Sequence, residues 1–438
     1  MPKFFICTFG CRCNQADSGA IRESLHRKGL EETPNHIDAD LVVVNSCTVT
    51  QRTDQQVRQA VRRFHRDNPG ARVVVAGCYA QRDPDALAAM PGVSLTVGNA
   101  DRERLAELLD EAAADPGLKV VCSPVVAHGP HFEIPPSRTG GKTRPLLKLQ
   151  DGCDARCSYC IVPSVRGPGR SARPEDVLTE IRALLEVGYR EIVLTGVNLG
   201  AYGRKLEGAP TLLGLLRRIL AIPGLGRLRL SSIEPMRFSR GIVRLAASSP
   251  ALAQHFHIPV QSGSDRVLRA MRRPYTAARF LSLVDFIRET LPFCGIGTDV
   301  LVGFPGESEE DFRLTCDLVR RAPLTYVHVF PFSARAGTAA CTMGPRIAPP
   351  VVHERVATLR SISHEKNLAF RRSLVGRELP AITLAKEEGM GDSTVLTENY
   401  VHALVAGPVD PNRLVKVRIV DARDEGTAAV VFQPGTRG

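Results

Sequence analysis

The sequence predicts an α/β protein in three parts: an N-terminal doubly wound parallel sheet, a central partial (β/α)6 barrel and a C-terminal small β-barrel. Two series in which apolar runs alternate with amphipathic stretches predict the first two parts, because strands separated by helices form parallel sheets. Short β-branched segments near the end of the chain, divided by turn residues, predict the third part. At 438 residues the chain also exceeds what one hydrophobic core usually holds.

The first series covers residues 1–122. Its apolar runs have the length and composition of buried strands, and the stretches between them have the periodicity of helices. We expect ligands to bind beyond the carboxyl ends of such strands. The predicted strands are residues 3–9, 39–45, 71–77 and 93–98, and the predicted helices are residues 18–29, 53–67 and 101–114.

Residues 123–142 are rich in Pro, Gly and Ser and predict an interdomain linker. The second series follows in residues 143–372. Six strands are too few for a full eightfold barrel, and an open barrel would have a wide mouth at the C-terminal ends of its strands. The predicted strands are residues 144–150, 190–196, 225–232, 255–260, 294–303 and 326–332, with helices in residues 174–188, 211–222, 240–249, 278–291 and 309–322.

Residues 373–436 have a different pattern, which predicts a five-stranded barrel of the oligonucleotide-binding type. Such barrels bind RNA, but they also bind sugars and proteins, so the barrel alone does not name a partner. Lys416 and Arg418 alternate with apolar residues on one predicted strand and are candidates to face phosphate, or simply solvated charge. The predicted strands are residues 378–385, 392–399, 400–406, 413–422 and 427–433.

Three cysteines, Cys153, Cys157 and Cys160, lie within the ten residues "DGCDARCSYC" that follow the first barrel strand. Four thiolates would complete a zinc site or fully ligate an iron–sulfur cluster, whereas three leave one coordination position open for chemistry. Zinc with a distant fourth ligand is one alternative, and three ordinary buried cysteines are another. The polar, Gly- and Asp-bearing segment argues against the second alternative.

A second set of cysteines follows the N-terminal strands. Cys11, Cys47 and Cys78 each lie at a predicted strand-to-helix turn. Because the carboxyl ends of adjacent parallel strands meet at one edge of a sheet, these thiols are expected to converge on a second metal site. Three unrelated cysteines are the alternative. Cys7 and Cys13 are competitors of Cys11, and we expect Cys7 to point toward the core and Cys13 to be a bystander.

Composition and charge limit the classes of protein to which this chain can belong. The net charge of +11 and the pI near 9.2 favour an anionic partner, with nucleic acid the leading candidate, although many proteins are basic for no specific reason. No apolar run approaches the roughly 20 residues of a membrane span, and no secretory leader is evident. We therefore expect a cytoplasmic protein without a membrane partner, in which the twelve cysteines form no disulfide framework and those that cluster bind metal.

Polar residues recur at the predicted barrel strand ends. They are candidates to bind a cofactor, and the surrounding glycines would let it approach the backbone closely. A single polar residue after a strand is more often a turn former or a helix cap. The prediction therefore depends on the occurrence of such residues at several strand ends of the same barrel. The polar candidates are Asn198, Glu234, Gln261, Asp299 and Glu307, and Gly196 is a further candidate to lie against the cofactor.

Over nearly its whole length the chain resembles the radical S-adenosylmethionine (SAM) methylthiotransferases. "GCDARCSYC" is similar to their C-x3-C-x2-C motif, "GCRCNQADS", "NSCTVT" and "GCYAQ" to their N-terminal ligand motifs, and "SSIEP", "HFHIPVQSGSDRVLRAMRRPYT" and "DVLVGFPGE" to their barrel motifs. "LTENYVHALV" is similar to their C-terminal TRAM domain. The combined "NSCTVT", "GCYAQ" and "TGVNLGAYG" most resemble the MtaB branch, which acts on N6-threonylcarbamoyladenosine in tRNA. Cys13 departs from the family's first motif.

The resemblance implies two 4Fe-4S clusters and SAM. Cys153, Cys157 and Cys160 would hold the cluster whose open iron binds SAM, and Tyr159 would pack on the SAM adenine. Cys11, Cys47 and Cys78 would hold an auxiliary cluster that carries the sulfur. Reductive cleavage of SAM would give a 5′-deoxyadenosyl radical able to remove the unactivated hydrogen at C2 of adenine. Candidates to contact RNA phosphate or cofactor are Arg166, Arg170 and Arg173, although exposed arginines are more often surface charge.

The implied reaction is methylthiolation of N6-threonylcarbamoyladenosine next to the anticodon of tRNA. The expected partners are the anticodon stem-loop and a low-potential electron donor. Relatives with the same three parts act on N6-isopentenyladenosine of tRNA or on an aspartate of a ribosomal protein, and these are alternatives. A zinc or electron-transfer module without catalysis is a third. Anaerobic protein with two clusters would be brown, whereas a zinc protein would be colourless.

Overall fold

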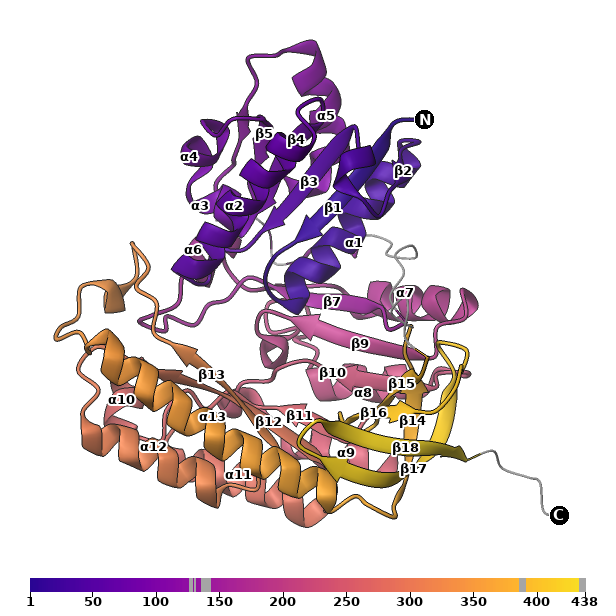
Figure 1. Ribbon diagram of the computed structural model, residues 1–438, viewed down its shortest axis with the longest axis vertical. Coiled ribbons are helices and arrows are strands. Elements are labelled where there is room, and N and C mark those ends of the chain that lie inside the picture. Colours follow the sequence, from indigo (N-terminus) through magenta and orange to yellow (C-terminus); the bar gives the residue numbers. More distant parts are fainter. Residues whose placement is uncertain (126–128, 130, 135–142, 386–390, 433–438) are drawn as a thin grey trace.

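The computed structural model describes residues 1–125, 129, 131–134, 143–385 and 391–432. Its N-terminal part is a six-stranded, wholly parallel sheet in the order β2-β1-β3-β4-β5-β6 (Figure 1). The four predicted strands are present, and two short edge strands are added. The strands are β1 (Lys3–Thr8), β2 (Glu31–Glu32), β3 (Leu41–Ser46), β4 (Arg72–Gly77), β5 (Val93–Val97) and β6 (Val120–Val121).

Helices cover both faces of this sheet, and two separate apolar clusters fill the space beneath them. The first helix begins at Arg12, six residues before the predicted start, so that polar Asn14 and Asp17 become buried helical residues. Sequence periodicity missed this turn because its buried side chains are polar. The helices are α1 (Arg12–Arg27), α2 (Gln51–Asp67), α3 (Cys78–Arg82), α4 (Pro84–Ala88) and α5 (Leu105–Ala114).

The six predicted barrel strands are present in the central part. Together with the short strand β8, which was not predicted, they form a four-stranded sheet, β10-β9-β7-β8, and a three-stranded sheet, β11-β12-β13. Backbone hydrogen bonds, such as that from the Ile233 N–H to the His257 carbonyl, join the two sheets into an open barrel. The strands are β7 (Leu146–Asp151), β8 (Arg170–Ser171), β9 (Glu191–Gly196), β10 (Arg227–Leu230), β11 (His255–His257), β12 (Gly295–Val302) and β13 (Tyr326–Pro331).

Helices on the outside of the barrel build the largest apolar cluster of the described residues with the strands. The five predicted crossover helices are present. The 24-residue α13, which crosses the outer layer in Figure 1, was not predicted, and neither were two short helices. The helices are α6 (Val162–Arg166), α7 (Pro174–Glu186), α8 (Leu212–Leu220), α9 (Arg240–Ser248), α10 (Asp265–Ala270), α11 (Ala277–Thr290), α12 (Glu309–Arg321) and α13 (Pro349–Arg372).

The C-terminal strands close into the predicted five-stranded barrel, in the order β14-β15-β16-β18-β17. Its interior is a small apolar cluster that includes Val395, Val417 and Ile419. Tyr400, at the turn before β16, lies against the central barrel, where its ring stacks on that of His255 at 4.1 Å. The strands are β14 (Glu378–Thr383), β15 (Ser393–Thr397), β16 (His402–Val405), β17 (Leu414–Arg423) and β18 (Gly426–Phe432).

The N-terminal sheet stands on the barrel, with α1 next to β7 (Figure 1). Arg12 donates to the Tyr400 hydroxyl at 2.8 Å and so links the first part to the last. Most of the predicted linker, residues 123–142, lies outside the described residues, and the predicted limits of the parts stay predictions. No helix in the described ranges combines the length and the apolar character needed to cross a membrane.

Candidate active site

The loop that carries Cys153, Cys157 and Cys160 connects β7 to α6 at the mouth of the barrel. Polar groups from other elements contact two of its sulfurs. The Asn198 amide donates to Cys153 Sγ at 3.7 Å, and the Arg273 guanidinium donates to Cys157 Sγ at 3.3 Å. All three thiols are free of disulfides, and burial raises the pKa of Cys160 to about 12. Hydrogen-bond donors at sulfur are typical of thiolates that hold iron–sulfur clusters.

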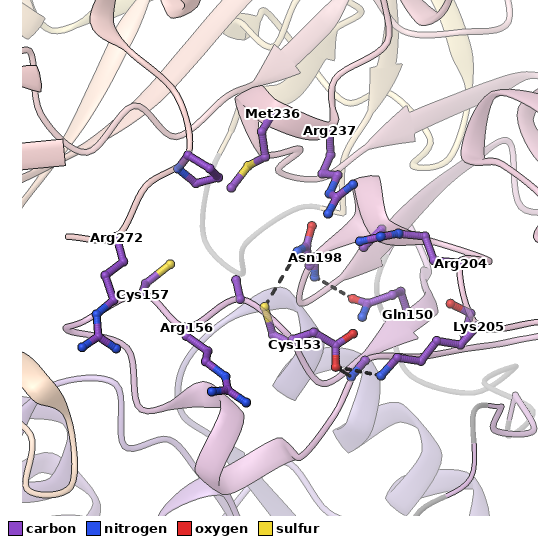
Figure 2. A pocket seen from close by; sticks show the side chains of 16 residues that line it. Gln150, Cys153, Arg156, Cys157, Asn198, Arg204, Lys205, Met236, Arg237 and Arg272 are labelled. Atoms are coloured by element: carbon purple, nitrogen blue, oxygen red, sulfur yellow. Dashed lines mark hydrogen bonds and ion pairs between the residues drawn. The ribbon is translucent and has the colours of Figure 1, made fainter. Parts of the chain in front are cut away.

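A cavity of about 390 Å³ opens beside this loop (Figure 2). Cys153, Cys157 and Asn198 line it, and the side-chain oxygen of Asn198, Oδ1, is buried without a partner among the described residues. A buried acceptor of this kind is costly unless a ligand or water satisfies it. The cavity therefore has the cysteines, the volume and an unsatisfied polar group that a cofactor needs.

The other predicted cofactor-binding residues lie at varied distances from this cavity. Gly196 packs so closely on Gln150 that a Cβ would lie 2.9 Å from the Gln150 Cβ. Glu234 forms an ion pair with Arg273, which links it to Cys157. Tyr159 packs against the apolar cluster that contains Met271 and Phe304. Of the predicted set only Asn198 lines the cavity, and cofactor contacts by the others stay predictions.

Gln261 lies beyond the end of β11 and bridges to Val300, the residue after Asp299 on β12. The Gln261 N–H donates to the Asp299 carbonyl at 2.8 Å, and Gln261 has a left-handed φ of 71°. The Asp299 carboxylate contacts His257 and His328 rather than the cysteine loop. Sequence analysis missed Arg273, although the quoted "MRRPYT" contains it, because nothing along the chain pairs this arginine with a cysteine more than a hundred residues earlier.

Cys11, Cys47 and Cys78 lie where expected, at the carboxyl ends of the adjacent strands β1, β3 and β4. The Sγ atoms of Cys11 and Cys78 lie 3.8 and 3.9 Å from the same Asn14 Oδ1. A Cβ on Gly10, whose φ is 103°, would lie 2.8 Å from Cys47 Sγ, so only glycine allows this approach. The fold brings the three thiols together.

The two other cysteines of this region lie differently. Cys7 is part of β1 and packs on the apolar cluster under α2, as expected. Cys13 is buried, and its Sγ lies 3.9 Å from Thr195 Oγ1 on the barrel strand β9. A hydrogen bond between the Cys13 and Cys11 side chains lowers the pKa of Cys11 to about 6. Cys11 shares the Asn14 oxygen with Cys78, whereas Cys13 contacts the barrel, and the choice of Cys11 as the ligand stays a prediction.

The two cysteine sets are held on contacting elements. Cys78 packs against Ile161 and Val165, which follow directly after the loop that ends at Cys160. The Asn99 amide donates to both Cys78 Sγ at 3.4 Å and the Val165 carbonyl at 2.7 Å. The N-terminal sheet therefore presents its cysteines to the mouth of the barrel.

Arg166 connects the two sets inside the protein. Its guanidinium donates to Asn14 at 2.6 Å and to Asp17 at 2.8 Å on α1, and to Asp151 at 2.8 Å at the end of β7. Arg102 and Lys148 complete the buried ion pairs. Burial alone would raise the pKa of Asp17, but the surrounding cations Arg102, Lys148 and Arg166 lower it to about 2.

This burial corrects the RNA contacts expected of Arg166 and Arg170. Arg166 is 5% exposed and Arg170 is 7% exposed. Arg170 lies 3.7 Å from Asp151 and over the ring of Phe132. A phosphate cannot reach guanidiniums that are enclosed and paired in this way. The RNA contacts were predicted because arginines usually lie on the protein surface, and these two arginines do not.

The remaining predicted RNA contacts stay predictions. Arg173 is exposed and lies 3.3 Å from His131. Lys416 is exposed on β17, and Arg418 forms an ion pair with Glu378 at 2.7 Å. Four arginines that sequence analysis missed line the cavity beside the cysteine loop. None of the four has a side-chain hydrogen bond or ion pair with another described residue, and they are Arg156, Arg204, Arg237 and Arg272.

Comparison with known proteins identifies this arrangement. Residues 3–98 match the family described as "Uncharacterized protein family UPF0004", and residues 147–319 match the radical SAM superfamily. The chain is 36% identical over 412 residues to the threonylcarbamoyladenosine tRNA methylthiotransferase MtaB of Aquifex aeolicus, covering 94% of this chain and 98% of that protein. This chain belongs to the radical SAM methylthiotransferase family. It is an enzyme, as the sequence predicted.

Other methylthiotransferases of the family match over similar lengths. The MtaB protein of Bacillus subtilis is 34% identical, over 95% of this chain and 93% of its own length. The tRNA-2-methylthio-N(6)-dimethylallyladenosine synthase of Parafrankia is 36% identical, over 94% of this chain and 85% of its own length. Both names describe tRNA methylthiotransferases, but the modified adenosines differ.

The fold has solved counterparts. The radical SAM methyltransferase TsrM of Kitasatospora setae, solved with cobalamin and a [4Fe-4S] cluster, superposes with a TM-score of 0.58 at 17% identity, over 78% of this chain and 74% of its own. At this identity the likeness shows the fold alone.

A radical SAM methylthiotransferase uses SAM and a 4Fe-4S cluster, and the loop at the barrel mouth fits this pair. It offers three free thiols and no fourth, donors from Asn198 and Arg273 at two sulfurs, and an adjoining cavity with an unsatisfied acceptor. The residues that would hold the cluster are Cys153, Cys157 and Cys160. The group would supply a carbon-centred radical, which no ordinary side chain of the barrel can provide.

Proposed function

We propose that this methylthiotransferase adds a methylthio group to C2 of N6-threonylcarbamoyladenosine, next to the anticodon of tRNA. One observation carries the proposal: two sets of three free cysteines lie on contacting elements, in a chain whose full-length relatives include enzymes named for this nucleoside. A second 4Fe-4S cluster on Cys11, Cys47 and Cys78 would hold the sulfur close to the radical source. The reaction takes place in the cytoplasm and draws electrons from a low-potential donor.

The chemistry explains why both sites must adjoin. The C2 hydrogen of adenine is removed by neither acid nor base at ordinary pKa, so a radical must take it. The resulting C2-centred radical must then react with sulfur before it reacts with solvent. Because α6 contacts Cys78, both cysteine sets lie at the mouth of the central barrel. The buried ion pairs of Arg166 fix the position of one set relative to the other.

Nucleoside mass spectrometry of tRNA tests the proposal. A strain that lacks this gene should lose 2-methylthio-N6-threonylcarbamoyladenosine and accumulate the unthiolated nucleoside, and the intact gene should restore the parent pattern. If the dimethylallyl nucleoside loses its methylthio group instead, the substrate is the one named for the Parafrankia relative. If a ribosomal aspartate loses it, the substrate is a protein. Normal levels of all three would contradict the assigned activity.

The four unpaired arginines of the cavity suggest how RNA binds. Arg156 is part of the cysteine loop, and Figure 2 shows Arg204, Arg237 and Arg272 around the same cavity. Guanidiniums without internal partners are available to phosphate, and the cavity beside them leads to Cys153. We infer that the phosphates flanking the target nucleotide lie against these residues.

Replacing both Arg156 and Arg204 by Ser should weaken binding of an anticodon stem-loop and lower the slope of log K against log salt by about 1 to 2. Fluorescence anisotropy over a series of salt concentrations measures both quantities. The matched control is Arg313→Ser combined with Arg320→Ser, which removes the same charge from α12, where both arginines form exposed ion pairs. An equal loss in both double variants would show that only the net charge of the protein matters.

A further inference from the structure

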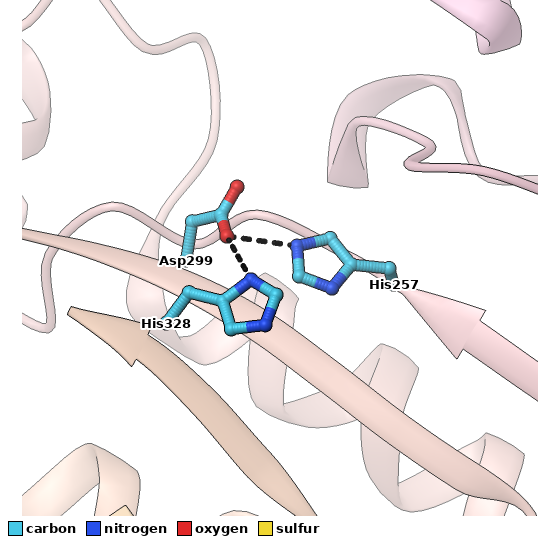
Figure 3. A group of neighbouring side chains, drawn as sticks. All are labelled: His257, Asp299 and His328. Carbon is cyan, nitrogen blue, oxygen red and sulfur yellow. Dashed lines mark hydrogen bonds and ion pairs between the residues drawn. The ribbon is translucent and has the colours of Figure 1, made fainter. Parts of the chain in front are cut away.

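A second group of metal-ligating side chains lies inside the barrel, outside both cysteine sets. His257 is on β11, Asp299 on β12 and His328 on β13, three neighbouring strands. His257 Nε2 lies 2.9 Å from Asp299 Oδ1, and His328 Nδ1 lies 3.4 Å from the same oxygen. Figure 3 shows both rings turned toward that carboxylate. The three ligand atoms lie within 4.8 Å of one another.

These separations are those of ligands around one ion. Ligands about 2.1 Å from an ion lie about 3.0 Å apart at octahedral angles and about 3.4 Å apart at tetrahedral angles. Two histidines and one carboxylate are a ligand set for Fe²⁺ or Zn²⁺, with other positions left open. A network of hydrogen bonds alone would have similar distances, so the residues around the group must decide between the two interpretations.

The surroundings of His257 are those of a ligand held in place. Its Nδ1 lies 3.1 Å from the Tyr326 hydroxyl, which in turn lies 2.8 Å from Nε2 of buried His255. Tyr326 lies directly over Gly297, where a Cβ would be 2.1 Å from the ring, so glycine makes room for this tyrosine. Ligating histidines usually have the other ring nitrogen fixed by such a partner.

The charge balance around Asp299 supports the same conclusion. Its side chain is 22% exposed, and among the described residues its carboxylate forms hydrogen bonds and ion pairs with the two histidines alone. No described Lys or Arg pairs with it, although the chain carries a net charge of +11. Nearby Glu234 adds negative charge and forms its own pair with Arg273. Apart from the two histidines, no described cationic side chain balances this carboxylate.

Access differs among the three ligands. His257 is buried, whereas the His328 side chain is 55% exposed. An ion held by all three would therefore be covered by protein on the side of His257 and open on the side of His328. We propose that His257, Asp299 and His328 bind a divalent first-row transition metal ion whose remaining coordination positions are open to the barrel interior.

Binding of Mn²⁺ to the anaerobic holoenzyme tests this site. Loss of the free-ion signal in room-temperature electron paramagnetic resonance counts bound Mn²⁺, and oxidised 4Fe-4S clusters do not interfere because they are diamagnetic. We expect one bound ion per chain, displaced by Zn²⁺, which binds such ligands more tightly than Mn²⁺. His328→Ala should weaken the affinity at least about tenfold.

Phe330→Ala is the matched control, because Phe330 follows His328 on the same face of β13 and has no ligand atom. It should bind Mn²⁺ like the parent. His328→Cys supplies a thiolate ligand for Zn²⁺ in place of the imidazole. This variant should bind Zn²⁺ in calorimetry, and such binding would show that the site tolerates substitution at this position. Equal Mn²⁺ binding by the parent and His328→Ala, or no stoichiometric binding by the parent, would overturn the proposal. The three side chains would then form a hydrogen-bond network without a metal ion.

Discussion

Replacing Cys157 by Ala is expected to abolish the reductive cleavage of SAM. Cys157 is one of only three thiols on the loop at the barrel mouth, and its sulfur accepts from Arg273 beside the cavity. With two thiolates left, the cluster loses an iron ligand that the loop cannot replace. Chromatography of reactions with dithionite and SAM should show 5′-deoxyadenosine at the background of protein-free samples.

The same variant should keep about half of its iron, because Cys11, Cys47 and Cys78 lie on separate elements of the N-terminal sheet. Cys316→Ala is the control, since Cys316 is a buried residue of α12 in the apolar cluster of the barrel and belongs to neither cysteine set. It should retain cleavage and iron content. Retained cleavage in Cys157→Ala would contradict the role given to the loop.

Replacing Arg166 by Met should destabilise the fold by about 3–5 kcal/mol, the usual cost of removing one partner from a buried ion pair. The change leaves Asp17 and Asp151 with fewer cations, and it removes the hydrogen bond to Asn14 beside Cys11 and Cys78. Thermal and urea unfolding of the holoenzyme measure the loss. Arg173→Met removes the same charge from an exposed position of the same segment and should change stability little.

Acid titration of these proteins gives an independent readout. The pKa of Asp17 is about 2 in the folded protein, below the roughly 3.9 of an unfolded carboxyl, so its stabilisation is present above about pH 4 and is lost as the pH falls toward 2. Without Arg166 the folded pKa rises, and acid unfolding should begin at a higher pH. Identical acid transitions in Arg166→Met and the parent would show that the ion pairs contribute no stability.

The sequence determined the fold class and the cysteine chemistry. Alternation of apolar and amphipathic segments is a local property, and it was enough to predict every strand of the three parts except the two-residue strands β2, β6 and β8. The spacing of Cys153, Cys157 and Cys160 also lies within one loop, so the open coordination position could be inferred without the fold. Strand-end placement correctly brought Cys11, Cys47 and Cys78 together, because parallel strands share one direction.

Tertiary structure alone decided where the charged residues lie. Arg166 and Arg273 look like surface residues along the chain, yet one joins two parts of the protein and the other contacts a cluster cysteine. The contacts of Asp299 with His257 and His328 were likewise not predicted from the sequence. Whether a charge is buried depends on which surfaces meet and which opposite charges they bring. That information is distributed over segments far apart in the sequence, and only the packed structure assembles it.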